Sequence, residues 1–153
     1  MISGIYKRLK SIADNEFSDI VLNSEIIFSF SGRARKLRLL LLDATFIDIW
    51  YSLEGEYSYH WEQREFRDTI YRHDNAPHAK WASVKTFPKH CHNGTDDKVV
   101  ESFIPDTPEE AIRVFVGIVR EQLLELKSNK KRKKRRNVKS GDIWDLKADL
   151  EED

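Results

Sequence analysis

Four of the chain's five histidines lie within residues 73–92, "HDNAPHAKWASVKTFPKHCH", together with its single cysteine and two of its four prolines. An imidazole exchanges protons near neutral pH and also binds transition metals, so such a cluster favours a functional site over a purely structural role. Pro77 and Pro88 each remove a backbone donor and disfavour helix at the preceding residue. We therefore expect this segment to be largely loop, where functional side chains are often held.

Two kinds of chemistry suit these side chains. In the first, one neutral imidazole takes the proton of a ribose 2′-hydroxyl, a second imidazolium protonates the leaving 5′-oxygen, and Arg or Lys stabilises the charged phosphorane. In the second, His90, Cys91 or His92 binds a divalent ion together with a carboxylate such as Asp74, and the ion activates water. The segment has neither a paired CxxC nor an HExxH motif, so we prefer the metal-free chemistry and expect no cofactor.

The preferred hypothesis assigns catalytic and substrate-binding roles to side chains in and near this segment. His90 and His92 are two positions apart, so both point to the same face if that part of the chain is extended. The catalytic candidates are the clustered titratable groups Asp74, His78, His90 and His92. The substrate-binding candidates are the polar side chains Arg72, Lys89, His60 and Asn75. The composition Asp-Asn-Ala-Pro is also common in turns, which is compatible with either role.

Helices are predicted at both ends of the region that must position these residues. Apolar residues at three- and four-residue spacings predict an amphipathic helix over residues 2–14. Thr107 as N-cap, Pro108 at the first helical position and Glu110 in a capping box predict a second helix that runs to about Lys127. Its apolar stripe, which includes Phe115, should face the core.

Alternation of period two predicts strands between the two helices. The segments that show it are "SEIIFSFSG", "RKLRLLLLDA", "TFIDIWYSL", "YSYHWEQREF" and "DTIYRHD", with a further short one in "DKVVESF". Short links favour antiparallel pairing, because a parallel pair needs a crossover of a dozen or more residues. The predicted fold class is therefore α+β, an antiparallel sheet of about five strands with an N-terminal and a long C-terminal helix packed on it.

One aromatic row has two interpretations. Tyr57, Tyr59 and Trp61 alternate with polar residues along a single predicted strand. A row of this kind can form a platform on which nucleic-acid bases stack, but it is more often part of a core. We expect the core.

Charge is distributed unevenly along the 153 residues. Residues 127–139 hold nine Lys and Arg and no acid, whereas residues 140–153 hold six acids and one Lys. We expect a single domain over residues 1–126 and a flexible charged tail over residues 127–153, whose basic run contacts RNA phosphates or is simply solvated. No window is apolar enough for a membrane span or a signal peptide, and one cysteine suits a reducing compartment, so we expect a cytoplasmic protein.

Three segments in order resemble the TumE family, small toxins of prokaryotic type II toxin-antitoxin modules. They are "YSYHWE" (57–62), "RHDNAPHAK" (72–80) and "FPKHCHNG" (87–94), and the resemblance covers about residues 20–126. It implies a toxin that acts on RNA and is neutralised by a cognate antitoxin with a DNA-binding domain. Family members often have a second histidine after the "DNAPH" run, where this chain has Ala79, so a mechanism that needs that doublet does not carry over.

The residues and the resemblance together favour a metal-independent endoribonuclease toxin. Two alternatives stay open. One is a metal-dependent nuclease that uses the same residues. The other is a non-catalytic module that binds nucleic acid or protein, in which the histidines only shape a loop.

Overall fold

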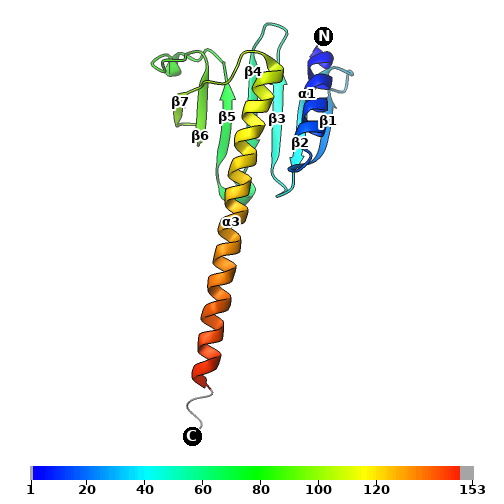
Figure 1. The fold of residues 1–153 in the computed structure, drawn as a ribbon. Coiled ribbons are helices and arrows are strands. Elements are labelled where there is room, and N and C mark those ends of the chain that lie inside the picture. Colours follow the sequence, from blue (N-terminus) through cyan, green and yellow to red (C-terminus); the bar gives the residue numbers. More distant parts are fainter. Residues whose placement is uncertain (1, 149–153) are drawn as a thin grey trace. The chain divides into compact units, whose positions relative to one another are not determined.

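The computed structural model describes residues 2–148, with side chains as far as Lys139. The fold is α+β, as predicted, with a helix at each end of an antiparallel sheet (Figure 1). The chain forms two compact units, residues 1–117 and residues 118–153, and the sheet belongs to the first. The elements are α1 (Ile2–Glu16), β1 (Val21–Phe28), β2 (Ala34–Leu41), β3 (Phe46–Tyr51), β4 (Tyr57–Glu62), α2 (Arg64–Arg67), β5 (Ile70–Asp74), the 3-10 turn η1 (Ala79–Trp81), β6 (His90–Gly94), β7 (Val99–Glu101) and α3 (Pro108–Ala148).

The sheet has seven strands rather than the predicted five or so, arranged in chain order with each strand antiparallel to the next. The strand that sequence patterning placed in loop is β6. His90, Cys91 and His92 are all buried. Two polar residues in a run of three consecutive buried positions do not give the alternation of buried apolar and exposed polar residues that predicts a strand. Short β7, a weaker expectation, pairs with β6 and forms the outer edge.

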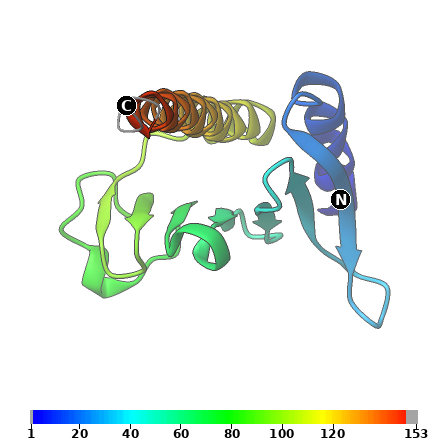
Figure 2. The ribbon, with the colours of Figure 1, turned by 90° about the horizontal axis from the view of Figure 1, so that it is seen from below.

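One face of the sheet carries the hydrophobic core. Leu37, Ile49 and Tyr59 lie in register across β2, β3 and β4, and all three are fully buried. Tyr6 of α1 accepts the Tyr51 backbone N–H at 3.0 Å, and the ring of Phe115, near the start of α3, lies 5.5 Å from that of Tyr59. Helices α1 and α3 both begin on this side of the sheet (Figure 2). We call the opposite face the helix-free face, because neither long helix begins on it.

The aromatic row of β4 belongs to this core. Tyr57, Tyr59 and Trp61 are 6%, 0% and 0% exposed, so the prediction of a core role is confirmed. The intervening side chains of β4, among them Ser58 and His60, point to the helix-free face. That face is therefore the polar one, on which a site can be built.

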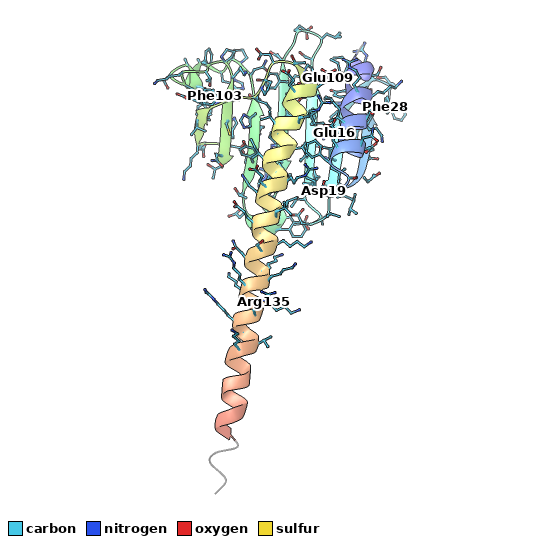
Figure 3. All side chains as sticks on the ribbon, viewed as in Figure 1. Glu16, Asp19, Phe28, Phe103, Glu109 and Arg135 are labelled. Atoms are coloured by element: carbon cyan, nitrogen blue, oxygen red, sulfur yellow. The ribbon has the colours of Figure 1, made fainter. Side chains whose placement is uncertain are left out.

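Aromatic side chains are exposed at both edges of the sheet (Figure 3). Phe28 ends β1 and is 55% exposed, and Phe103 follows β7 and is 76% exposed. The predicted strand that included Phe30 ends earlier, because residues 29–33 form the β1–β2 turn, in which Gly32 has φ +84°. A side chain at Gly32 would strain this turn.

Helix α3 begins at Pro108, as its capping pattern predicted, and its backbone continues through the basic run to Ala148. The side chains of the basic run, including Arg135, are exposed (Figure 3). Flexibility of residues 127–153 stays a prediction, and the side chains of the acidic end, residues 140–153, lie outside the described part. Among the described residues, no helix is long and apolar enough to cross a membrane.

Candidate functional site

Alternation along β5 and β6 brings four predicted site residues to the helix-free face. The antiparallel register pairs Asp74 with His90 and Arg72 with His92. Side chains of paired residues share a face, so these four lie together. Cys91 points the other way, where it pairs with His73 on the helix side.

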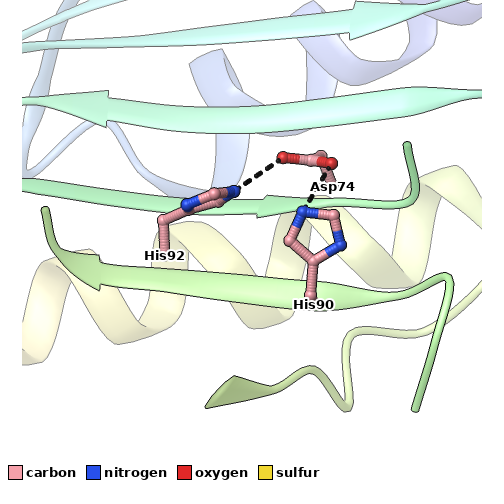
Figure 4. A group of neighbouring side chains, drawn as sticks. All are labelled: Asp74, His90 and His92. Carbon is pink, nitrogen blue, oxygen red and sulfur yellow. Dashed lines mark ion pairs between the residues drawn. The ribbon is translucent and has the colours of Figure 1, made fainter. Parts of the chain in front are cut away.

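Asp74 lies between the two histidines (Figure 4). The Nε2 atom of His90 is 3.0 Å from Asp74 Oδ1, and the Nε2 atom of His92 is 3.4 Å from Asp74 Oδ2. The centroids of the two imidazole rings are 4.9 Å apart, and the ring planes make an angle of 71°. We call Asp74, His90 and His92 the Asp74 cluster.

The outer nitrogen of each ring faces a backbone carbonyl. His90 Nδ1 is 2.7 Å from the Pro88 oxygen, and His92 Nδ1 is 3.0 Å from the Asp96 oxygen. A carbonyl oxygen only accepts, so each Nδ1 carries a proton and donates it. In the neutral form of either ring the lone pair is then on Nε2 and faces the Asp74 carboxylate.

The Asp74 carboxylate is held in its ionised form. Burial alone would raise its pKa, but the His92 ring, the Ala76 N–H and the nearby charges of His90 and Arg72 outweigh burial and keep the pKa below its usual range. The Ala76 N–H donates to Oδ1 at 3.0 Å, and Arg72 Nε donates to Oδ2 at 3.2 Å. Asp74 therefore supplies a fixed negative charge to the cluster.

The cluster opens on one side into a cavity of about 650 Å³, which we call the histidine cavity. The residues that line it and could act on a ligand are Arg72, Asp74, His78, Lys80, Trp81 and His92. His78, Lys80 and Trp81 come from the irregular segment that links β5 to β6, and Trp81 packs against the rings of His90 and His92. His90 is fully buried and does not line the cavity.

A second open depression adjoins the histidine cavity, and the two share Trp50, Ser58 and Arg72. We call it the basic depression, because its lining includes the cations Arg33, Arg35 and Lys36. His60 also lines it, with its Nε2 atom 2.6 Å from Glu62 Oε2. Burial lowers the pKa of His60 more than the Glu62 hydrogen bond raises it. This ring is therefore mainly neutral near pH 7.

Two predicted substrate-binding residues, Lys89 and Asn75, line neither hollow. Lys89 Nζ donates to the Ile104 carbonyl oxygen and pairs with Asp106. The side chain of Asn75 accepts the Tyr57 N–H at 2.8 Å and donates to the Gly55 oxygen at 3.1 Å. Asn75 thus ties the β3–β4 turn to the end of β5.

Several residues in the two hollows were not singled out from the sequence. Trp81 and Lys80 lie inside the histidine-rich segment but have no periodic signal. Trp50, 40% exposed, alternates with the buried Ile49 and Tyr51, and this alternation could have indicated an aromatic side chain on the polar face. Arg33 belongs to the β1–β2 turn, far from the histidine-rich segment in the sequence, and it lines the basic depression only because the strands between them pair in order.

Among the described residues, one group has the composition and spacing of a metal site. It is the Asp74 cluster, in which one ligand atom from each residue lies within 4.8 Å of the others. Cys91 is not part of it, because the thiol lies on the helix side and burial raises its pKa to about 11.

The cluster and both hollows fall inside a region that matches a known family. The family model described as "Toxin TumE" matches residues 8–123, well over half of the chain. No curated protein and no solved structure matches the chain.

Proposed function

The chain belongs to the TumE toxin family, and on that premise we propose that it is a toxin that acts as an endoribonuclease. The observation that carries the proposal is that His78, His92 and Asp74 line one open cavity together with the cations of Arg72 and Lys80. Imidazoles, a fixed carboxylate and cations in one accessible hollow are the groups that cleavage of an RNA phosphodiester requires.

In the proposed reaction a backbone phosphate binds between Arg72 and Lys80. His92 or His78 takes the proton of the ribose 2′-hydroxyl, whose oxygen attacks phosphorus to form a 2′,3′-cyclic phosphate. The bond from phosphorus to the 5′-oxygen breaks, and the other imidazole donates a proton to that oxygen. The two cations stabilise the extra charge of the phosphorane.

His90 has a different part in this proposal. Because it is fully buried beneath Trp81, it does not meet RNA directly. It acts through Asp74, whose carboxylate it contacts, and Asp74 in turn orients His92. We therefore assign His90 as a positioning residue and His92 and His78 as the catalytic ones.

The basic depression extends the proposed RNA site. A strand that crosses from the histidine cavity would meet Trp50 and Arg72, which the two hollows share, and then Arg33 and Lys36. An exposed indole beside cations can stack on an unpaired base, whereas a duplex keeps its bases inside. We propose single-stranded RNA as the substrate.

The basic run at residues 130–136 supplies a further cationic surface on α3, and its side chains are exposed. We propose that it contacts RNA phosphates without sequence preference, in which case its contribution falls steeply with salt.

Family membership also indicates an antitoxin partner. We propose that the antitoxin carries a DNA-binding domain and that the pair acts in the cytoplasm, where RNA is accessible.

A cleavage assay on purified protein tests the proposed function. A labelled single-stranded RNA is incubated with the wild type, with His78→Ala and with His92→Ala, and we expect each variant to lose about 10²–10⁴-fold in rate. Lys80→Ala should also slow cleavage, whereas Lys85→Ala, an exposed lysine of the same segment that lines neither hollow, should not.

Two results would contradict the proposal. If the wild-type protein binds RNA in a salt-sensitive manner but never cleaves it, the non-catalytic alternative replaces the enzyme. If an RNA with a single 2′-deoxy nucleotide is still cut at that nucleotide, attack by the 2′-hydroxyl is wrong. Circular dichroism of each variant must match the wild type before a lost activity is assigned to chemistry.

A further inference from the structure

We propose that Asp74, His90 and His92 bind a divalent transition-metal ion, with the remaining coordination positions open to the histidine cavity. This inference goes beyond the proposed function: it assigns a ligand to the site and can hold whether or not the protein cleaves RNA. Two imidazoles and one carboxylate are a ligand set that zinc, manganese and iron(II) sites use when they keep positions open for water or substrate.

The spacing of the ligand atoms fits one ion. Metal–nitrogen and metal–oxygen bonds at such sites are about 2.1 Å long. With these lengths, two ligand atoms of one ion lie at most about 4.2 Å apart. The separations of 3.0 Å from His90 Nε2 to Asp74 Oδ1 and 3.4 Å from His92 Nε2 to Asp74 Oδ2 both satisfy this limit.

The orientation of the rings is the second observation. Both Nδ1 atoms donate to backbone carbonyls, so the Nε2 lone pairs of two neutral rings converge on a carboxylate that is itself only an acceptor. The Nε2 atom of His90 is buried and makes no hydrogen bond, although Asp74 Oδ1 is 3.0 Å away. In the neutral ring this nitrogen carries a lone pair that meets only the Asp74 carboxylate, and a cation between the three groups would join these acceptors.

The groups around the cluster match those that hold metal ligands in place. Metal-binding histidines nearly always donate their second nitrogen to a carbonyl or carboxylate, as both rings do here. The ligating carboxylate is usually hydrogen-bonded in turn, and Asp74 accepts the Ala76 N–H. Trp81 packs over both rings, which limits their rotation. The ligand positions are therefore set before an ion binds.

Protonation of both histidines is the competing explanation. Two imidazolium rings would each donate to Asp74 and remove the need for an ion. The two ring centroids are 4.9 Å apart, and Arg72 donates to the same carboxylate at 3.2 Å. Two imidazolium rings or one divalent ion would bring the same positive charge to Asp74, so titration with metal ions distinguishes the two arrangements.

The ligand types also limit which ion fits. Two imidazole nitrogens suit zinc, manganese, iron(II) or cobalt, whereas calcium and magnesium prefer oxygen ligands. Thiolate chemistry does not contribute, since Cys91 faces the helix side. An ion here would use the Nε2 lone pair of His92, so this ring would then not be the proton acceptor, whereas His78, outside the ligand set, would remain available for proton transfer.

Metal binding is measured on the full chain after removal of bound ions by a chelator and dialysis. Zinc, manganese and cobalt(II) are titrated separately by calorimetry, and cobalt is also followed by its visible absorption. We expect one ion per chain, with affinity lowered more than about 100-fold in His92→Ala and in Asp74→Asn, since loss of a ligand should exceed the 10–100-fold effect of an outer-shell change. A bound ion should also raise the midpoint of thermal unfolding.

Further variants test which side chains hold the ion. Cys91→Ser and His78→Ala should bind the ion as the wild type does, because neither side chain is in the ligand set. His90→Ala removes a fully buried ring, so His90→Gln, which fills more of the space, is the paired variant, and both should weaken binding. A folded wild type that binds none of the three ions overturns the inference, as does tight binding that survives His92→Ala or is lost in Cys91→Ser.

The outcomes for metal binding and for RNA cleavage can be separated. Cleavage by chelated protein that binds no ion supports the metal-free histidine mechanism and removes the metal site. Stoichiometric binding that requires the Asp74 cluster supports the metal site even if no RNA substrate is cut.

Discussion

Replacement of Asp48 by Asn should lower the stability of the fold and raise the affinity for RNA. It lines the basic depression and accepts hydrogen bonds from Lys36 Nζ at 2.8 Å, Arg38 Nε at 2.8 Å and Arg38 Nη2 at 2.9 Å. Its side chain is 17% exposed, whereas its partners are 33% and 34% exposed. Asp48→Asn keeps the shape of the side chain and leaves two cations without their counter-charge.

The expected loss of stability follows from this geometry. A hydrogen bond to a fully buried charge contributes about 1.5–3 kcal/mol, and an exposed ion pair contributes about 0–1 kcal/mol. Water screens the two partly exposed cations, so we expect Asp48→Asn to lower the free energy of unfolding by about 1–2 kcal/mol at pH 7. Asp68→Asn, an exposed position with φ 50° that Asn tolerates, is the matched control and should change it by less than about 0.5 kcal/mol.

The effect of Asp48 should depend on pH. Burial alone would raise the pKa of Asp48, but Arg38 and Lys36 outweigh burial and lower it. A lowered pKa in the folded state gives stability that is present above the unfolded pKa of about 3.9 and is lost as pH falls through the folded value. Urea unfolding should therefore separate the wild type from Asp48→Asn at pH 7 and show little difference once the pH is below the folded pKa of Asp48.

RNA binding should change in the other direction. Of the two released cations, Lys36 lines the basic depression. Its release should raise the affinity for single-stranded RNA several-fold and steepen the salt dependence by about one unit of log–log slope. Binding is measured by fluorescence anisotropy at several salt concentrations. If Asp48→Asn loses stability as expected but binds RNA no better than Asp68→Asn, RNA does not pass through the basic depression.

Two further predictions concern the two faces of the sheet. Phe115→Ala should lower the free energy of unfolding by about 3–5 kcal/mol, because its buried ring contacts Tyr59 and Tyr71. Val114, on the same helix, is 43% exposed, so Val114→Ala should change the free energy of unfolding little. Similar losses for both variants in urea unfolding would contradict the packing of α3. Trp50→Ala should weaken single-stranded RNA binding by about 1–3 kcal/mol, roughly 5- to 150-fold, without loss of stability; unchanged anisotropy titrations would remove Trp50 from the interface.

Local patterns in the sequence were sufficient for the fold class and for the face of most strands. Alternation placed Tyr59 and Trp61 in the core, and capping residues placed the start of α3 at Pro108. The number of strands was underestimated because His90 and His92 are polar yet buried. Their burial results from Trp81 and from the register of β5 against β6, neither of which a local pattern contains.

The candidate site shows the same limit. The spacing of His90 and His92 correctly predicted a shared face if the segment is extended, and β6 is extended. The same period of two, continued back to Lys89, predicts that this lysine shares the face of Cys91 and not the face of His90 and His92. The contacts of the two histidines with Asp74 depend on antiparallel pairing between segments separated by an irregular loop. Sequence spacing alone does not fix that pairing.

The most direct test of the account is the rate at which purified protein cleaves single-stranded RNA, compared among the wild type, His92→Ala and Lys85→Ala. We expect the wild type and Lys85→Ala to cleave at similar rates, and a folded His92→Ala variant to lose at least about 100-fold in rate. Wild-type protein that leaves RNA intact, with or without added zinc or manganese, or a His92→Ala variant that cleaves as fast as the wild type, would contradict it.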